Sequence, residues 1–221
     1  MPYREHLSKD KRLQKLVSSH QPFKLTKETK VYLHLCGSIM SQQLSTKVAD
    51  VIWKRFLALY EKGEPTPEQI ISTPFSTLRS IGLSNAKANY VQNVARFALE
   101  EGMALEQLQV MNDEEVITHL TKIKGVGRWT TEMLLMFALG REDIFSPDDL
   151  GIQNAMIAIY KLDRTDKKKF REKMLQISGK WSPYRTYACL HLWRWKDNSP
   201  IKSSPKKKIK HSAKSKTKKS A

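Results

Sequence analysis

The chain has 221 residues, a formal net charge of +17 and 40% hydrophobic residues. This composition can bury the core of one large or two small domains, so it excludes a chain that is disordered throughout. The longest apolar runs, such as residues 133–140, are far shorter than the ~20 residues that span a bilayer, and no apolar signal-peptide segment follows the charged N-terminus. We therefore expect a soluble intracellular protein, cytoplasmic with the nucleoid if bacterial and nuclear if eukaryotic.

The cysteine and histidine content argues against a metal or redox centre. The two cysteines, Cys36 and Cys189, are too few for an iron–sulfur cluster or a disulfide framework, and we expect both to be buried. The six histidines show no metal-ligand spacing, and no Walker-type loop or dinucleotide fingerprint is present. The sequence predicts no cofactor and no metal site.

Positive charge is spread over the whole chain and is densest at the C-terminal end. Residues 199–221 hold nine lysines and no acidic residue in a low-complexity stretch of Lys, Ser and Pro. Such a segment cannot bury enough apolar area to fold alone, so we expect a disordered electrostatic tail; a solubilising tail without a partner is the alternative. A polyanion is the expected partner, and nucleic acid is favoured over a membrane because no amphipathic anchor accompanies the charge.

Helix start signals recur along residues 1–198, which we treat as one domain. Residues 46–60 carry a single apolar stripe, typical of a peripheral helix, whereas the helix predicted from Pro183 is apolar on nearly every face and belongs inside the domain. An alternating strand pattern is considered only for residues 1–25. The sequence therefore predicts an all-α fold. The start signals, in chain order, are Thr66-Pro67 with Gln69, Thr73-Pro74, Ser84, Asn112 with Glu115, Thr165-Asp166 and Ser182-Pro183.

The segment around residues 120–130 predicts two helices joined by a tight hairpin. Gly125 and Gly127 flank Val126, and a new helix opens at about Arg128. Glycine permits a close approach of the main chain, and free N–H groups at a helix N-terminus bind phosphate. A glycine pair alone is weak evidence, because many helix pairs turn on glycine. With the basic residues around it, we predict a phosphate-binding site formed by Lys124, Gly125, Val126, Gly127, Arg128 and Thr130.

Longer segments carry a resemblance to a known family. "LTKIKGVGRWTTEMLL" followed by "DIFSPDDLGI" resembles the signature of the helix-hairpin-helix (HhH-GPD) DNA glycosylase superfamily. Within it the chain most resembles the 3-methyladenine DNA glycosylase II branch, the alkylbase glycosylases. The resemblance covers roughly residues 30–196, including "SIMSQQLSTKVA", "IGLSNAKANYV" and "WSPYRTYACLHLWRW". It implies a two-lobed helical bundle with the substrate cleft between the lobes, acting as a monomer on double-stranded DNA.

Two acids, about twenty residues after Trp129, precede a further apolar helix that contains Ile152, Met156 and Ile159. On the residues alone, either Asp148 or Asp149 could simply cap that helix. The resemblance implies that Asp149 is the catalytic carboxylate, and leaves Asp148 as a cap or orienting group. Cleavage of an N-glycosidic bond builds positive charge on the deoxyribose, which a carboxylate beneath C1′ stabilises, and the same group can direct a water molecule.

Aromatic residues complete the predicted site. Superfamily members that also cut the DNA backbone carry a lysine where Trp129 stands, so the resemblance implies no lyase activity. It also implies that Trp129 and Trp193 line the base pocket, where cation–π attraction favours a positively charged methylated base; core packing is the alternative for each. Met133 replaces a third pocket aromatic found in some relatives, which puts the breadth of accepted lesions in doubt.

Two further DNA contacts follow from the resemblance. Gln43, with Gln42 beside it, is the candidate plug for the gap left by a flipped base; a polar loop without a DNA contact is the alternative. Ser84 and Lys87 resemble a second contact to the DNA backbone, although a solvated helix start explains them equally well.

The sequence therefore predicts a monofunctional DNA glycosylase that excises alkylated purines, chiefly 3-methyladenine with 7-methylguanine as a further candidate, in base excision repair. The alternatives are a non-catalytic helix-hairpin-helix DNA-binding protein and a glycosylase for deaminated bases.

Overall fold

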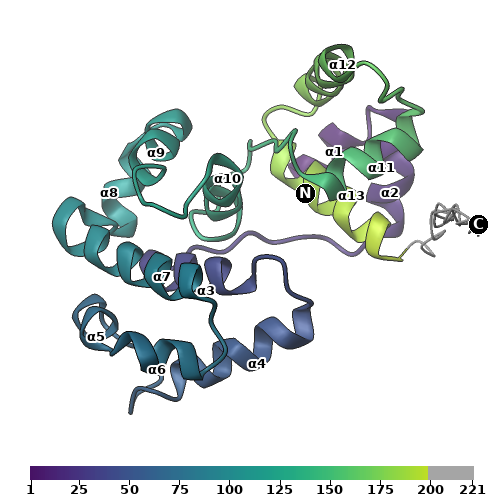
Figure 1. The fold of residues 1–221 in the computed structure, drawn as a ribbon. Coiled ribbons are helices and arrows are strands. Elements are labelled where there is room, and N and C mark those ends of the chain that lie inside the picture. The colour runs from purple at the N-terminus through teal and green to yellow at the C-terminus, as the bar shows by residue number, and fades with distance from the viewer. Residues whose placement is uncertain (199–221) are drawn as a thin grey trace, which may run out of the picture.

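The computed structural model describes residues 1–198, and the tail predicted at residues 199–221 lies outside them. Within the described range the chain forms thirteen α-helices, one π-helical turn and no strand, as predicted for an all-α fold. Figure 1 shows two groups of helices, which we call the hairpin lobe and the terminal lobe. An extended segment, residues 20–30, joins them, and residues 138–149 form the second connection.

The hairpin lobe comprises the middle of the chain. Its helices α3, α4, α7, α9 and α10 pack side by side, with α3 in contact with α4, α7 and α10. The elements of the hairpin lobe are α3 (Val31–Ser41), α4 (Thr46–Leu57), α5 (Pro67–Ser72), α6 (Phe75–Ser80), α7 (Asn85–Phe97), the π-helical turn η1 (Ala98–Gly102), α8 (Leu105–Val110), α9 (Asp113–Leu120) and α10 (Arg128–Phe137).

The terminal lobe brings the two ends of the described chain together. Helix α13 packs against both α11 and α2, and Ala188, Cys189 and Leu192 on it are fully buried. This agrees with the prediction that the late apolar helix lies inside the domain, since side chains on nearly every face find an apolar neighbour. The elements of the terminal lobe are α1 (Pro2–Leu7), α2 (Lys11–Ser19), α11 (Leu150–Tyr160), α12 (Lys167–Gly179) and α13 (Arg185–Asn198).

Most of the predicted helix starts are confirmed. Capping boxes are formed by Thr66 with Gln69 and by Asn112 with Glu115, and Ser84 caps α7 by accepting a hydrogen bond from the N–H of Lys87. These pairs satisfy N–H groups that a helix leaves free at its start, and each contributes ~1 kcal/mol. Both cysteines are fully buried, as predicted.

Three details of the prediction are wrong. Residues 1–25 contain helices α1 and α2 and no strand, because Leu13, Leu16 and Val17 recur at helical spacing and pack into the core. Thr73 ends α5 and does not cap α6, whose N-cap is Pro74. The helix predicted from Pro183 begins at Arg185.

No helix among residues 1–198 combines the length and the apolar content that crossing a membrane requires.

Candidate active site

Asp149 lies at the point where the two lobes meet. It is the N-cap of α11, and its Oδ1 accepts hydrogen bonds from the N–H of Ile152 and from Nε1 of Trp193, both at 2.8 Å. Its Oδ2 accepts a hydrogen bond from Nε1 of Trp129 at 3.0 Å. A carboxylate offers about four acceptor positions, so these three bonds fix its orientation and leave one position open. The capping role and the predicted catalytic position therefore coincide in one residue.

The two predicted pocket tryptophans converge on this carboxylate from different lobes. Trp129 comes from the first turn of α10 in the hairpin lobe, and Trp193 from α13 in the terminal lobe. Trp129 is 42% exposed, too open for a residue that only packs in a core. Both indoles turn their N–H edge toward Asp149; the ring of Trp129 stays exposed, whereas Trp193 is half-buried and packs against the core.

Gly151 makes room for this arrangement, and sequence reasoning missed it. A Cβ atom at residue 151 would lie 2.9 Å from Cδ1 of Trp193 and 3.0 Å from Oδ1 of Asp149. Real Cβ atoms do not approach heavy atoms so closely, so any other residue would push the indole away from the carboxylate. A glycine inside the first turn of a helix, where alanine is the better helix former, was the available signal.

A cavity of about 690 Å³ opens beside Trp129. This volume is typical of small-molecule pockets. Asp149 does not line the cavity itself. Trp129 connects the cavity with Asp149, since it lines the cavity and donates its indole N–H to the carboxylate. Side chains from α10 form one wall and those from the end of α3 and the following loop form the other: Trp129, Thr130, Met133 and Phe137 face Ser38, Ser41, Gln42, Gln43 and Leu44.

Phe137 is a further pocket aromatic that sequence reasoning missed. It lines the cavity, is 38% exposed, and its ring centroid lies 5.8 Å from that of Trp193. The spacing of Trp129, Met133 and Phe137 at steps of four on one helix face could have revealed it. Met133 stands where some relatives have a third pocket aromatic, and Phe137, one turn later on α10, supplies a ring at the same cavity.

The loop after α3 carries both predicted plug residues. Gln43 adopts a positive φ of 59°, which is uncommon for a non-glycine residue, and it lies on the cavity wall. Nε2 of Gln42 donates to the hydroxyl of Thr130 on α10 at 3.3 Å. Thr130 is buried, so its side chain faces the cavity wall and not the hairpin surface, where we predicted a phosphate contact.

Lys87 also makes a contact that differs from the predicted one. Its Nζ donates to the carbonyl oxygens of Met40 at 2.9 Å and of Gln42 at 2.6 Å. Burial there lowers the pKa of Lys87. The ammonium group therefore ties the end of α3 and the loop after it (residues 42–45, the plug loop) to α7. The N–H of Lys87 stays at the predicted helix start, where Ser84 accepts it.

The hairpin makes the tight turn at Gly125 that the sequence predicts. Gly125 has a φ of 106°, and a Cβ there would lie 2.2 Å from Cγ of Tyr90. By contrast, Gly127 has a φ of −103°, and nothing lies within 4 Å of its Cβ position. Among the described residues, the N–H groups of residues 127–130 donate to no protein acceptor. They form a row of unpaired donors at the N-terminus of α10, where residues 127–129 are exposed and Thr130 is buried.

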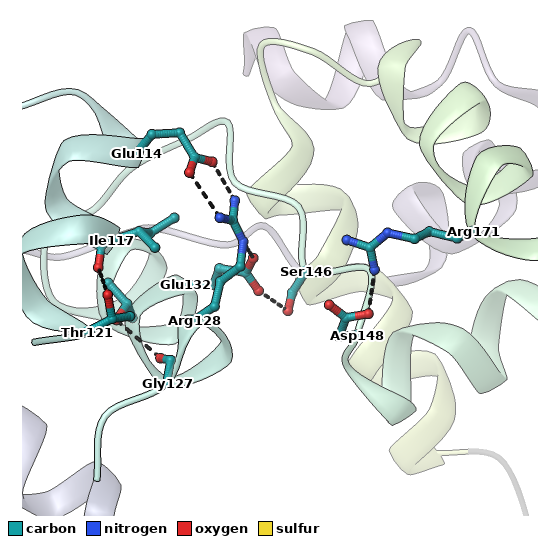
Figure 2. A network of polar contacts seen from close by, with 10 residues as sticks. Glu114, Ile117, Thr121, Gly127, Arg128, Glu132, Ser146, Asp148 and Arg171 are labelled. Atoms are coloured by element: carbon teal, nitrogen blue, oxygen red, sulfur yellow. Dashed lines mark hydrogen bonds and ion pairs between the residues drawn. The ribbon is translucent and has the colours of Figure 1, made fainter. Parts of the chain in front are cut away.

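Two predicted hairpin ligands are used differently. The N–H of Val126 donates to the carbonyl of Ile123 at 3.0 Å, and its side chain is buried, so it anchors the turn. Figure 2 shows the guanidinium of Arg128 directed away from the turn, toward Glu114 and Glu132. These partners, Glu114 first, raise the pKa of Arg128 and offset its charge. Lys124 stays exposed with no ion pair among the described residues, so its predicted phosphate contact is still open.

Asp148, predicted as a cap or an orienting group, does not cap α11. Its side chain forms an ion pair with Arg171 of α12 (Figure 2). The alternative that Asp148 caps α11 is therefore wrong, since Asp149 does so. Within residues 1–198, no three His, Cys, Asp or Glu side chains lie close enough to hold a metal ion.

Comparison with known proteins shows which family has this architecture. Residues 36–180 match the family HhH-GPD, described as "HhH-GPD superfamily base excision DNA repair protein". DNA-3-methyladenine glycosylase 1 of Schizosaccharomyces pombe is 36% identical over 186 residues, which cover 83% of this chain and 80% of that protein.

Two solved structures have the same fold. The S. pombe 3-methyladenine DNA glycosylase in complex with abasic DNA has a TM-score of 0.76 at 35% identity, covering 88% of this chain and 96% of that one. A DNA-3-methyladenine glycosidase of Bacillus halodurans has a TM-score of 0.77 at 32% identity, covering 90% of each chain. This chain belongs to the HhH-GPD superfamily of base excision DNA repair proteins.

Proposed function

We propose that this protein is a monofunctional DNA glycosylase of the 3-methyladenine type, which hydrolyses the N-glycosidic bond of alkylated purines in double-stranded DNA. The single observation that carries the proposal is the convergence of Trp129 and Trp193 on the carboxylate of Asp149, beside a cavity. The names of the relatives support the same activity. We assign it to residues 1–198 as one monomeric domain, acting in the nucleoid or nucleus.

DNA binding begins at the hairpin. The free N–H groups of residues 127–130, with the positive end of the α10 dipole, bind a phosphate of the damaged strand without reading its sequence. Lys124 adds positive charge beside them. Gln43, on the loop held by Lys87, fills the space that the flipped nucleotide leaves in the duplex.

The extruded base then stacks on the exposed indole of Trp129, with Met133 and Phe137 along the same cavity wall. An alkylated purine such as 3-methyladenine is positively charged, so electron-rich rings favour it over the neutral parent base by ~1–2 kcal/mol. Selectivity of this kind needs few hydrogen bonds to the base edge.

Bond cleavage places growing positive charge on the sugar, and the Asp149 carboxylate stabilises it and directs the attacking water. The charged purine leaves without a strong general acid. Trp129 occupies the position of the lysine amine that lyase-active relatives use, so the product is an intact abasic site.

The test is base release from a duplex oligonucleotide that contains 3-methyladenine, followed by chromatography, for the wild type and Asp149→Asn. We expect release by the wild type and a loss of ~100-fold or more in Asp149→Asn, typical for removal of a group that stabilises transition-state charge. Asp148→Asn is the matched control, because Asp148 faces Arg171 and should stay within threefold of the wild type. DNA binding without base release by the wild type would leave a non-catalytic DNA-binding protein.

Two further substrates separate the remaining alternatives. Duplexes with uracil or hypoxanthine should release base far more slowly than the methylated duplex, since neither base is charged. Strand cleavage without alkali or heat would contradict the monofunctional assignment.

A further inference from the structure

Glu132 is a buried carboxylate in the middle of α10. It is 4% exposed. Three residues that follow it on the same helix, Leu134, Leu135 and Met136, are fully buried and apolar. A charge in such surroundings is stable only when partners compensate for the lost water. A leucine there would fill the space at lower cost, so the contacts of Glu132 call for an explanation.

One of its carboxylate oxygens binds a different segment of the chain, and the other binds a residue of its own helix. Oε2 accepts a hydrogen bond from the hydroxyl of Ser146 at 2.5 Å, and Oε1 accepts one from Nε of Arg128 at 3.1 Å. Ser146 is fully buried and lies in the connection between α10 and α11. Figure 2 shows Glu132 between Arg128 and Ser146, reaching from the hairpin lobe to the segment that leads to Asp148.

The same serine also holds the catalytic residue. Its carbonyl oxygen accepts a hydrogen bond from the N–H of Asp149 at 3.3 Å. The carboxylate of Asp149 in turn accepts the N–H of Trp129, which lies three residues before Glu132 on α10. Helix α10 is therefore joined to Asp149 at two points: the exposed Trp129, and the buried pair of Glu132 and Ser146.

We infer that Glu132 is a positioning residue that, through Ser146, fixes the Asp149 segment to α10, so that the carboxylate and the base-stacking Trp129 keep their relative places. This inference rests on the proposed function. Trp129 is 42% exposed and stacks the base on its ring face, so its hydrogen bond to Asp149 is open to competition from water. The buried pair touches no substrate and keeps the segment in place throughout. A misplacement of about 1 Å at a reacting group can slow a reaction ~100-fold.

The test compares Ser146→Ala, Glu132→Gln and the double variant with the wild type. The measured quantities are the single-turnover rate of base release at saturating enzyme, the Kd for a duplex with an abasic-site analogue, and the melting temperature. Ser178→Ala is the matched control, since Ser178 is a similarly buried serine whose hydroxyl donates to the carbonyl of Leu175 within its own helix, α12.

We expect Ser146→Ala to lower the single-turnover rate by about 10-fold with the Kd within twofold, and Ser178→Ala to leave both unchanged. Because the two residues act as one unit, the double variant should be no slower than the slower single variant.

Rates within twofold of the wild type in folded Ser146→Ala and Glu132→Gln would overturn the inference and leave the pair a purely structural contact. A Kd that weakens in step with the rate would overturn it too, in favour of a role in DNA binding. If Ser146→Ala does not fold, the same criteria apply to Glu132→Gln alone. Absence of base release by the wild type would refute the proposed function, whereas the outcomes above concern only the pair.

Discussion

Three N–H groups from three segments of the chain hold the carboxylate of Asp149. The donors are the main chain of Ile152, the third residue of the helix that Asp149 caps, and the indoles of Trp129 and Trp193. Their arrangement is complete before any substrate binds. A preorganised carboxylate needs no rearrangement as charge develops on the sugar, which is the condition for efficient electrostatic stabilisation.

Gly151→Ala tests whether this arrangement matters. Alanine favours a helix over glycine by up to ~1 kcal/mol, so stability should hardly suffer. The added methyl group, however, would lie against Trp193 and Asp149, so we expect the single-turnover rate of base release to fall about 10-fold or more. The matched control is Gly179→Ala at the end of α12, where nothing lies within 4 Å of the added Cβ. Equal rates for both variants would show that the indole adapts without loss.

Trp129→Phe separates the two roles of the indole. Phenylalanine keeps an aromatic face for stacking but removes the N–H donor to Asp149. A hydrogen bond to a charged group contributes about 1.5–3 kcal/mol, so we expect a 10- to 100-fold slower single turnover with the affinity for methylated duplex retained. Trp129→Ala should lose both. A rate in Trp129→Phe equal to that of the wild type would mean that the indole serves stacking alone.

At the scale of elements, the hairpin uses its two glycines for different reasons. Gly125 is required by the fold, because its positive φ and the ring of Tyr90 exclude a side chain. Gly127 is not, because its φ is accessible to any residue and its Cβ position faces open space. A glycine without an internal reason points to an external neighbour that approaches the main chain closely.

Gly127→Ala should therefore affect binding more than folding. Loss of glycine at an N-cap costs at most ~1 kcal/mol of stability, whereas the methyl group would obstruct a phosphate at the free N–H groups. We expect a weaker Kd for duplex DNA, measured by fluorescence anisotropy, with a melting temperature within a few degrees of the wild type. Gly125→Ala is the contrasting variant and should unfold more easily. Unchanged DNA affinity in Gly127→Ala would place the phosphate elsewhere.

Lys87 of α7 binds the plug loop through hydrogen bonds to main-chain carbonyls. If the ammonium group bound a DNA phosphate, Lys87→Met would reduce the slope of log K against log salt by about one. Since Nζ is bound to the carbonyls of Met40 and Gln42, we expect an unchanged salt slope and weaker binding to a duplex with a lesion. Affinity for undamaged duplex is the internal control. A reduced slope would restore the phosphate contact predicted from the sequence.

At the scale of the whole molecule, a histidine pair ties the segment after α2 to α13. Nδ1 of His20 and Nδ1 of His191 lie 3.0 Å apart, so at least one ring must be neutral. Burial, followed by His20 and the nearby Arg4 and Arg194, lowers the pKa of His191 to about 3, and burial also lowers that of His20. The folded state thus favours neutral rings, while the unfolded chain takes up protons below pH ~6.5.

Stability should accordingly fall in acid. The pair contributes its full share of the free energy of unfolding at pH values above ~6.5, the histidine pKa in the unfolded chain. That share is lost as the pH falls from ~6.5 toward the lower pKa of the folded state. We expect a decrease of about 1 kcal/mol in the free energy of unfolding per pH unit between pH 6 and 5, measured by urea denaturation. His20→Gln should flatten this dependence. Equal stability at pH 7 and pH 5 would contradict the assignment of neutral rings.

Local signals explain how much of the fold was predictable. The capping boxes at Thr66 and Asn112 and the spacing of apolar residues act within a few positions, so the sequence alone predicts the helices they start. The same locality explains the errors: Thr73-Pro74 carries a helix-start signal, yet the preceding helix uses Thr73 as its end. The family assignment and the all-α, two-lobed fold are confirmed, whereas the roles of the individual site residues remain predictions.

The sequence by itself determined the family, the helical composition and the residues whose types carry the chemistry: an acid at the helix start, tryptophans and a glycine hairpin. Only the tertiary structure decided what these residues touch. The N–H bonds of Trp129 and Trp193 to Asp149, the space at Gly151, the loop contact of Lys87 and the buried pair of Glu132 and Ser146 join positions 2 to 47 residues apart. Side-chain direction across such separations depends on how whole helices pack, and no local pattern in the chain records it.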